Sequence, residues 1–268
     1  MSGPLISCVV PVFNGERYLK EALDTILAQT YRPLEIIVAD DGSTDGPAAV
    51  VAGYGASVRY LSQPNAGPAA ARNLGLGTTR GAFVAFLDAD DLWHPEKLAR
   101  QMTRFAARPD LDLGVTHACN FWIPELRERA ARYRDHPRMA GSLPGYSPVT
   151  LLARRTVFDA VGGFDVTLPV GKDTDWFLRA AEHAAVMELL PDVLVYRRLH
   201  HTNMGWRAVP RNSREQEVFV RVIKASLDRR RRLDAGTVRP YPFSASDWQR
   251  RIQAECESYS GRSSSGPI

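Results

Sequence analysis

The sequence lacks any apolar run that approaches the roughly 20 residues a membrane-spanning helix needs. Its first residues contain no basic region followed by a long apolar stretch, which a secretory signal requires. It has only three cysteines, Cys8, Cys119 and Cys256, and their wide separation matches neither paired nor metal-ligand spacing. We therefore expect a cytoplasmic protein in a reducing compartment that is not integral to a membrane.

The net charge is also small, +4 over 268 residues, but basic residues crowd the C-terminal part, from Arg207 to the run 229–232. Two explanations are open for these residues. They form the solvated face of an arginine-rich helix, or they attract anionic lipid head groups and bring the protein into peripheral contact with a membrane. Aromatic residues are not interleaved with these arginines, so we expect no nucleic-acid partner.

The first part of the chain alternates between strand and helix patterns. Apolar, β-branched runs predict strands at 6–12, 34–39 and 58–61, and helical spacing predicts a helix at 16–30. Such alternation is typical of a parallel sheet with right-handed crossovers. A Rossmann dehydrogenase is disfavoured because the turn at 11–16, Pro-Val-Phe-Asn-Gly-Glu, lacks the glycine spacing that binds a pyrophosphate.

The second part of the chain is less regular. We expect a long surface excursion over 121–146, a region rich in Arg and Pro with little periodicity. Two strands are predicted at 186–190 and 193–196, and an amphipathic helix at 215–232. The low-complexity tail is expected to be disordered.

A cluster of carboxylates follows the buried strand that begins at Phe83. Side chains alternate along an extended chain, so Asp88 and Asp90 are expected to project on the same side. Two like charges about 5 Å apart repel by roughly 3 kcal/mol at an effective dielectric constant near 20. A divalent cation with phosphate oxygens would offset that cost. The alternative is that these acids cap the next helix, but Pro95 suits a first helical position and places that cap near His94.

A second acidic cluster follows the strand at 34–39. Asp45 precedes Pro47 and is expected to cap the next helix. Asp40 and Asp41 are not needed for capping and are predicted to accept hydrogen bonds from a base or a ribose. Ligands bind at the carboxyl ends of strands in open α/β sheets, which favours this interpretation.

Four motifs occur in a fixed order: 11–16, Asp-Asp-Gly-Ser-Thr-Asp at 40–45, Asn-Ala-Gly at 65–67 with Ala-Arg-Asn-Leu-Gly at 71–75, and Phe-Leu-Asp-Ala-Asp-Asp at 86–91. With them the sequence resembles the family 2 glycosyltransferases of GT-A fold, over about residues 5–203. The resemblance implies a Rossmann-like α/β fold, a mixed and mostly parallel sheet flanked by helices, with a helical C-terminal extension. It also implies hexosyl transfer from a nucleotide diphosphate sugar, usually UDP-linked, with inversion and with Mn²⁺ or Mg²⁺.

We expect a glycosyltransferase domain at 1–210, a helical extension at 211–259 and a disordered tail at 260–268. Within the domain, 1–108 is expected to bind the nucleotide-sugar and the metal, and 109–210 the acceptor.

The family motifs assign roles to individual residues. By resemblance, the nucleotide-sugar is held by Pro11, Phe13, Asp40, Asp41, Asn65, Arg72 and Asp88. Asp90, the last acid of the family's DXD motif, would ligate the metal. His200 lies in a His-x-x-Asn pattern with Asn203 and would reach the metal or a phosphate.

The family's general base is the aspartate of a Glu-Asp pair at a helix start, and the matching positions here are Lys172 and Asp173. The aspartate is present and its acidic neighbour is replaced, and a nearby lysine would lower the aspartate's pKa and basicity. Asp175 is the rival base, and helix capping is the structural alternative for both. Trp176 either stacks on an acceptor sugar or belongs to the core.

Two alternatives to glycosyl transfer were considered. A non-catalytic relative that binds a nucleotide-sugar as a sensor or scaffold is favoured slightly by Lys172. A nucleotidyltransferase is disfavoured because the glycine-rich, basic loop after the first strand is missing. The sequence does not identify the sugar, nor whether the hydroxyl acceptor is a saccharide, a lipid-linked molecule or a peptide.

Overall fold

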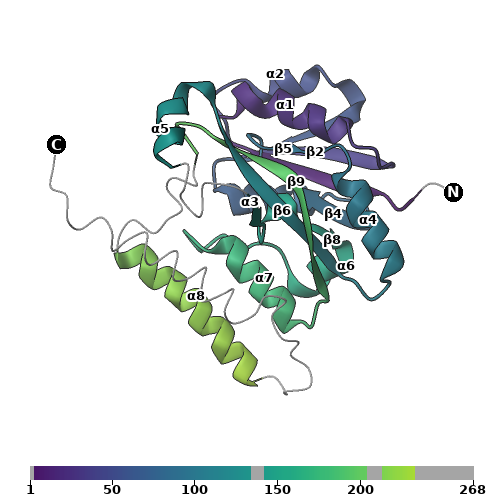
Figure 1. Cartoon of the computed structure of the whole chain (residues 1–268), viewed down its shortest axis with the longest axis vertical. Helices are drawn as coiled ribbons and strands as arrows, with labels where there is room; N and C mark the ends of the chain where they lie inside the picture. Colours follow the sequence, from purple (N-terminus) through teal and green to yellow (C-terminus); the bar gives the residue numbers. More distant parts are fainter. Residues whose placement is uncertain (1–2, 134–141, 204–212, 233–268) are drawn as a thin grey trace.

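The computed structural model describes residues 3–133, 142–203 and 213–232. Helices lie on both sides of a central sheet, with α1 (Glu16–Leu27) and α2 (Pro47–Ala52) at one end of the molecule and α7 (Lys172–Glu182) and α8 (Ser213–Arg232) at the other (Figure 1). None of the helices in these described ranges is long and apolar enough to cross a membrane. The predicted tail and Cys256 lie outside the described residues.

The described strands form one mixed sheet in the order β3-β2-β1-β4-β8-β6-β9-β5, with β7 paired to β6. Parallel pairing joins β1 to β2 and β4, β2 to β3, and β6 to β9, whereas β8, β7 and β5 pair antiparallel with their neighbours. The strands are β1 (Ile6–Val12), β2 (Leu34–Asp40), β3 (Val58–Ser62), β4 (Phe83–Phe86), β5 (Leu92–Trp93), β6 (Leu113–Trp122), β7 (Ser142–Pro144), β8 (Leu152–Arg154) and β9 (Met187–Leu199). The expected mixed α/β sheet is thereby confirmed.

The remaining helices connect these strands. They are α3 (Pro68–Leu76), α4 (Lys97–Ala107), α5 (Arg127–Arg132) and α6 (Arg155–Val161), with 3₁₀ turns at Gly55–Ser57, Pro124–Leu126 and Pro148–Thr150. The small residues of α3 allow it to lie close to the sheet. A Cβ atom added to Gly75 would clash with the Val9 side chain on β1.

The alternation of side chains along β1 produces two cores. Cys8 and Val10 belong to a core under α1 and α4, whereas Val9 belongs to a second core with α3, α6 and α7. Both cores contain fully buried side chains, which explains why the central strands are continuously apolar. A sheet covered on both faces leaves its strand ends as the natural place for polar chemistry.

Two predictions in the second half were wrong. The strands expected at 186–190 and 193–196 are the single strand β9. Its pairing with β6 is irregular around Thr116 and His117, and this irregularity accommodates the gap between the two predicted strands. The excursion expected over 121–146 contains the helix α5 and the strand β7 in its described part. β7 is held by its pairing with β6, and α5 follows the 3₁₀ turn whose Glu125 pairs with the distant Arg17; local periodicity records neither contact.

Two helix caps also differ from expectation. Asp45 does not cap α2; its carboxylate accepts the backbone N–H of Glu16 at the start of α1, 2.9 Å away, while Glu16 accepts the N–H of Gly46 at 3.0 Å. The helix α4 begins at Lys97 with Glu96 as its cap residue, and the His94 ring accepts the N–H of Glu96 at 3.2 Å. The acids Asp88 and Asp90 are indeed not used for capping α4.

A lysine is buried in the core. Lys97 has no exposed surface, and its amine donates to Gln101 at 2.9 Å and lies 4.3 Å from the centre of the Trp93 ring. Because burial penalises the charged amine, its pKa falls to about 7. The nearby Cys8 thiol is buried as well, and burial raises its pKa to about 12.

Replacing this lysine should change how stability depends on pH. Between about pH 7 and its ordinary pKa of 10.5, Lys97 binds a proton only in the unfolded chain, so wild-type stability rises with pH over this window. Relative to Lys97→Met, the free energy of unfolding of the wild type should rise by about 4 kcal/mol at most from pH 7 to 10. Urea unfolding of both proteins at pH 7 and pH 10 measures this difference. If the free energy of unfolding changed equally in the two proteins, the buried-amine assignment would be contradicted.

Candidate active site

The carboxyl ends of β1, β2 and β4 meet at one edge of the sheet. Val12 at the end of β1 is paired in register with Asp40 at the end of β2. Asp40 is buried and accepts hydrogen bonds from the Ser43 backbone at 3.0 Å and from the Tyr60 hydroxyl at 2.5 Å. This carboxylate therefore shapes the turn after β2.

Asp41 holds the loop that precedes α3. Its carboxylate accepts hydrogen bonds from the Gln63 side chain at 2.7 Å and from the backbone of Ala66 and Gly67 at 3.0 and 2.7 Å. The loop also contains Asn65, which is exposed. The structure thus places Asp41 and Asn65 in the same corner, with Asp41 already engaged in bracing the loop.

The end of β1 carries two further residues of the predicted nucleotide site. Pro11 is buried and in register with Ala39 on β2. Phe13 lies just beyond the strand, and 52% of its side chain surface is exposed. An exposed aromatic ring beside buried strand ends offers a flat apolar surface to a ligand.

Arg72 on α3 occupies the centre of the site. It is 6% exposed and forms ion pairs with Asp88 at 2.8 Å and with Asp173 at 3.2 Å. Burial opposes the charge, but the two carboxylates outweigh it and raise the pKa of Arg72. Its Nε atom is buried without a hydrogen-bond partner, and the Phe164 ring centre lies 5.6 Å from the guanidinium carbon.

The acids after β4 have different hydrogen-bond partners. The strand ends at Phe86, and the Asp91 N–H donates to the Asp88 carbonyl at 3.0 Å, which forms a turn instead of an extended segment. Asp88 therefore faces Arg72, and Asp90 contacts His200 and Asn203. The expectation of an extended segment here was wrong, because the chain turns after β4 and the two carboxylates have different partners.

Asp90 and the His-x-x-Asn segment come together as a group. The same Asp90 oxygen lies 2.8 Å from His200 Nε2 and accepts the Asn203 amide at 3.1 Å. The Asn203 side chain also accepts the His200 backbone N–H, which closes the loop after β9. The ring of His200 is buried against Tyr18, with ring centres 4.9 Å apart.

Sequence reasoning missed Arg198, which positions this loop. It is buried, its backbone N–H donates to Asp91 at 2.9 Å, and its side chain donates to the Asp90 carbonyl at 2.9 Å and to Glu21 at 2.6 Å. Burial and the neighbouring Asp90 charge raise the pKa of Asp91. The only local signal for this role was an arginine in a strand-like run. Such a signal does not indicate that the partners of Arg198 lie more than a hundred residues away.

The first turn of α7 brings Lys172 and Asp173 to Arg72. Lys172 is half-buried, and burial followed by the repulsion of Arg72 lowers its pKa. Asp175 points elsewhere: it is buried and paired with Arg179 at 2.8 Å and with Arg229 of α8 at 3.7 Å. Only Asp173 of the two candidate bases is therefore seen paired with Arg72.

Trp176 belongs to the core. It is fully buried, its indole N–H donates to the Gly162 carbonyl at 3.0 Å, and its ring stacks on Phe158 with centres 4.7 Å apart. The core interpretation of this residue is confirmed, and stacking of this ring on an acceptor sugar is excluded by its burial.

A divalent metal fits this site only if substrate and water supply most of its ligands. No group of three or more His, Cys, Asp or Glu side chains is clustered for a metal within the described residues. Asp90 and His200 do converge within 2.8 Å, and both are partly or largely shielded from solvent. Magnesium-type ions usually take one or two protein carboxylates and complete their shell with substrate phosphates and water, so the Asp90 carboxylate suits such an ion.

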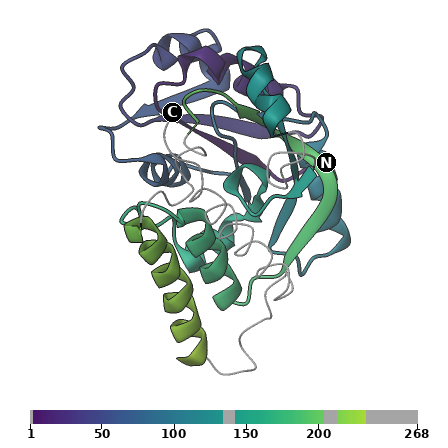
Figure 2. The ribbon, with the colours of Figure 1, turned by 60° about the vertical axis from the view of Figure 1, so that its left-hand side comes forward.

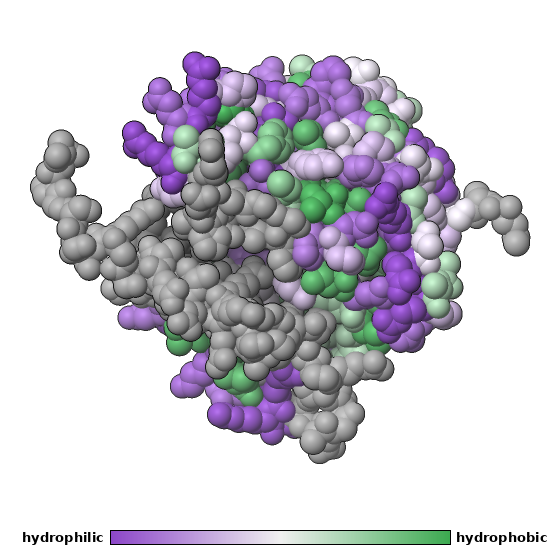
Figure 3. Space-filling view, in the orientation of Figure 1, coloured by the Kyte–Doolittle hydropathy of each residue, from purple (hydrophilic) through white to green (hydrophobic). Residues whose placement is uncertain are grey.

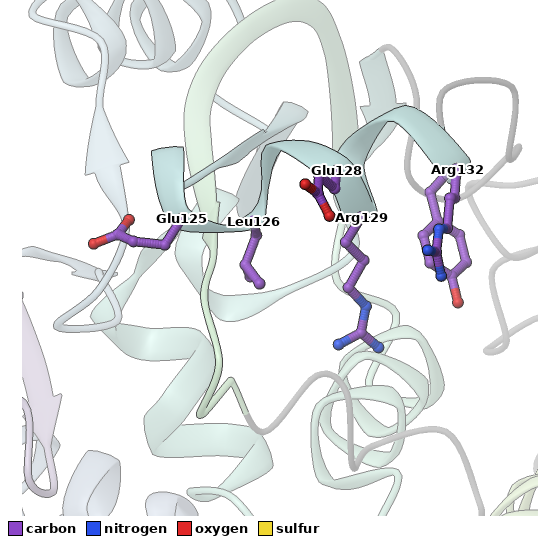
Figure 4. Close-up of a pocket in the computed structure, with 6 residues that line it drawn as sticks. Glu125, Leu126, Glu128, Arg129 and Arg132 are labelled. Carbon is purple, nitrogen blue, oxygen red and sulfur yellow. The ribbon is translucent and has the colours of Figure 1, made fainter. Parts of the chain in front are cut away.

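A separate hollow lies along α5. It is lined by Glu125, Leu126, Glu128, Arg129, Arg132 and Tyr133, whose side chains are drawn in Figure 4. Glu125 is ion-paired with Arg17 at 2.8 Å, and Leu126 packs with Tyr18 behind the His200 ring. The hollow thus adjoins the Asp90–His200 side of the site.

Known proteins are similar to this chain over more than half of its length. The family model described as glycosyl transferase family 2 matches residues 7–162. An uncharacterised glycosyltransferase of Rickettsia typhi is 32% identical over 187 residues, which are 65% of this chain and 58% of that protein. The uncharacterised glycosyltransferase EpsJ of Bacillus subtilis is 28% identical over 215 residues, 72% of this chain and 61% of that protein. The chain thus spans about three fifths of the length of these relatives.

Two solved structures share the fold. S. aureus TarS 1-349 has a TM-score of 0.65 and 20% identity, covering 98% of this chain and 73% of that chain, and it has also been solved with UDP and with UDP-GlcNAc. The mannosyltransferase PcManGT of Pyrobaculum calidifontis, solved with GDP-Man and Mn²⁺, has a TM-score of 0.60 and 20% identity, covering 99% and 76%. These likenesses confirm the predicted GT-A fold class.

Proposed function

Because the chain belongs to glycosyl transferase family 2, we propose that it transfers a sugar from a nucleotide diphosphate donor to an acceptor hydroxyl with inversion. The observation that carries this proposal is the buried Arg72, which joins Asp88 behind β4 to Asp173 on α7. One cation thereby links the predicted donor side to the predicted base. We also propose the division into a donor half at 1–108 and an acceptor half at 109–210.

The donor is proposed to lie across the ends of β1, β2 and β4. Phe13 and Asn65 are accessible there, and Pro11, Asp40 and Asp41 form the buried wall behind them. UDP is the favoured nucleotide because the structural neighbour TarS is solved with UDP and UDP-GlcNAc. Arg72, with a planar guanidinium suited to phosphate, would approach the diphosphate from α3.

The proposed metal ligands are Asp90 and His200, with Mn²⁺ or Mg²⁺ as the ion, and PcManGT holds Mn²⁺. When bound, such an ion neutralises the departing diphosphate. Asn203 and Arg198 hold Asp90 in place through hydrogen bonds, and the Asn203 side chain also accepts the His200 backbone N–H. This arrangement orients the carboxylate and the imidazole toward the same point before a ligand enters.

Asp173 is the proposed general base. Its carboxylate would take the proton of the acceptor hydroxyl while the acceptor oxygen bonds to the anomeric carbon. The bond from that carbon to the diphosphate oxygen breaks, and the electron pair leaves with the nucleoside diphosphate. The configuration at the anomeric carbon is thereby inverted. The Asp173 carboxylate is ion-paired with Arg72, and a diphosphate that attracts Arg72 would free the carboxylate for the proton.

Lys172 should contribute to donor binding. It adds a second cation beside Arg72, so Lys172→Gln should raise the KM for the donor about fivefold, the effect of one partly solvated charge. Removing a cation near Asp173 should also shift the acidic limb of the rate profile to higher pH, because the aspartate then protonates more readily. Steady-state kinetics across pH measures both, with Lys20→Gln on α1 as the matched control. An unchanged KM and an unchanged limb would remove Lys172 from the site.

The activity itself is tested by nucleoside diphosphate release. We would incubate the chain with a panel of UDP-sugars and GDP-mannose, with Mn²⁺ present or chelated and with water as the default acceptor. Metal-dependent release from one donor is expected and would identify the sugar. Nucleotide release that is unchanged when Mn²⁺ is chelated would contradict the metal assignment. Tight donor binding without nucleotide release, whichever acceptor is added, would favour the alternative function.

That alternative is a non-catalytic nucleotide-sugar-binding relative that acts as a sensor or scaffold. One observation favours it: a lysine stands beside Asp173 where the family has an acid, and Arg72 already neutralises the aspartate. In that case the Asp173→Asn variant would bind donor like the wild type, and neither protein would release a nucleotide.

A further inference from the structure

The helix α8 is fixed in orientation by one of its faces. Val222 and Ser226 are almost completely buried against the molecule, and the Ser226 hydroxyl bonds to Glu182 on α7. One turn further, Arg229 pairs with Glu182 at 2.5 Å and with Asp175 at 3.7 Å. These three residues recur at the spacing of a single helical stripe, so the opposite stripe must face outward.

The outward stripe combines apolar and basic side chains. Val220 is 63% exposed and Leu227, two turns later, is 46% exposed. Lys224 and Arg231 are also exposed and follow these two residues by four positions each. At 100° per residue, Val220, Lys224, Leu227 and Arg231 line up along α8, and we call them the outer stripe.

Exposure of this kind is uncommon elsewhere on the described residues. Their exposed large hydrophobic side chains are Phe13, Val166, Val220 and Leu227, and two of these four lie on the outer stripe. A helix that only faced water would carry polar residues at both positions. The outer stripe is therefore unlike the solvated helix face that an arginine-rich sequence by itself predicts.

We propose that the outer stripe docks α8 on a membrane surface rich in anionic lipid. Apolar side chains spaced along one face enter the boundary between head groups and acyl chains, and flanking cations are attracted to lipid phosphate. The neighbouring Arg232 adds positive charge at the same end of α8, and Arg231 can exchange its exposed partner Asp228, 3.2 Å away, for a phosphate. The helix lies on the surface and does not span it.

Charge decides between a membrane and a second copy of the chain. In a symmetric dimer the same stripe meets itself, so the Lys224 and Arg231 cations of two copies gather at one interface to which the stripe supplies no anion. An anionic surface removes that repulsion and is complementary to both cations. The outer stripe thus fits a lipid surface better than it fits itself.

The position of α8 allows a flat surface to approach. In two views α8 forms an outer edge of the molecule, next to α7 and far from α1 and α2 (Figures 1 and 2). Hydrophilic and hydrophobic residues lie side by side at this end of the molecule (Figure 3). The contact with α7 uses the inner face of α8, so docking leaves the packing of the fold intact.

Vesicle sedimentation of the full chain tests the proposal. We expect binding to vesicles of equal parts phosphatidylcholine and phosphatidylglycerol, weaker binding at high salt, and little binding to phosphatidylcholine alone. Val220→Ser with Leu227→Ser should weaken binding about tenfold, the loss expected when two half-exposed apolar side chains no longer enter the lipid. Lys224→Gln should weaken it about fivefold, corresponding to one cation near the surface.

Matched controls separate the stripe from general surface properties. Val166→Ser removes an equally exposed apolar side chain away from α8, and Lys20→Gln removes an exposed lysine on α1. Both controls should bind vesicles like the wild type, and all variants should keep the wild-type thermal unfolding midpoint. Equal binding of the stripe variants and the controls, or no binding to anionic vesicles, would overturn the proposal. So would a wild-type dimer in solution that the Val220→Ser, Leu227→Ser double variant dissociates. The measurement does not depend on the proposed transferase activity.

Discussion

The Asp173→Asn variant is expected to lose turnover by a factor of about 10² to 10⁴ while still binding the donor. The acceptor hydroxyl has a pKa far above neutrality, so its proton must move to a base as the new bond forms. An asparagine amide keeps the shape of the side chain and can still contact Arg72, but it cannot accept that proton. Steady-state kinetics gives the loss in kcat, and calorimetric titration with donor tests binding.

The matched control is Asp175→Asn on the same helix. This carboxylate is buried and paired with Arg179 and Arg229, so its loss should lower the stability of the α7–α8 contact and affect turnover much less. If Asp175→Asn abolished turnover and Asp173→Asn did not, the roles of the two residues would be exchanged. Thermal unfolding of both variants separates a loss of folded protein from a loss of chemistry.

The Asp90→Asn variant should lose metal-dependent donor binding. Replacing an outer partner of a metal ligand costs about 10- to 100-fold in metal affinity, so removing a carboxylate ligand should cost at least about 100-fold. Titration of Mn²⁺ into the protein with UDP present measures this directly, without relying on turnover. The amide of the variant can still pair with His200 and Asn203, so the loop after β9 is expected to stay in place.

Asp91→Asn is the control for this experiment. The Asp91 carboxyl is buried and accepts the Arg198 backbone N–H, which an asparagine oxygen can also accept. It should therefore keep the metal affinity of the wild type. Metal-dependent binding that survives in Asp90→Asn would show that the ion, if required, is held by other residues.

Much of the first half of the fold was predictable because its signals are local. The strands at 6–12, 34–39 and 58–61 and the helix over 16–30 were placed within a few residues of β1, β2, β3 and α1. Periodicity records which face of an element is buried, and that requires only neighbours along the chain. The same signal failed at β9, where the pairing with β6 carries the strand past an interruption.

The residues of the candidate site could be predicted from the sequence, but the contacts among them could not. The motifs named Arg72, Asp88, Asp90, Asp173 and His200, but their order along the chain does not say which of them meet. In the structure Asp88 and Asp173, 16 and 101 positions from Arg72, share that one guanidinium. After the turn that follows Phe86, Asp90 pairs with His200, whereas Asp88 pairs with Arg72.

Patterns along the chain were enough to predict the alternation of strands and helices, the family, and the identity of the polar residues at the strand ends. The folded arrangement was needed to show that Asp173 and not Asp175 meets Arg72, that Arg198 braces the Asp90 loop, and which face of α8 points outward. The physical reason is the range of the interactions. Helical and strand periods are properties of adjacent residues, whereas ion pairs and buried stripes depend on how elements that are distant in sequence pack together.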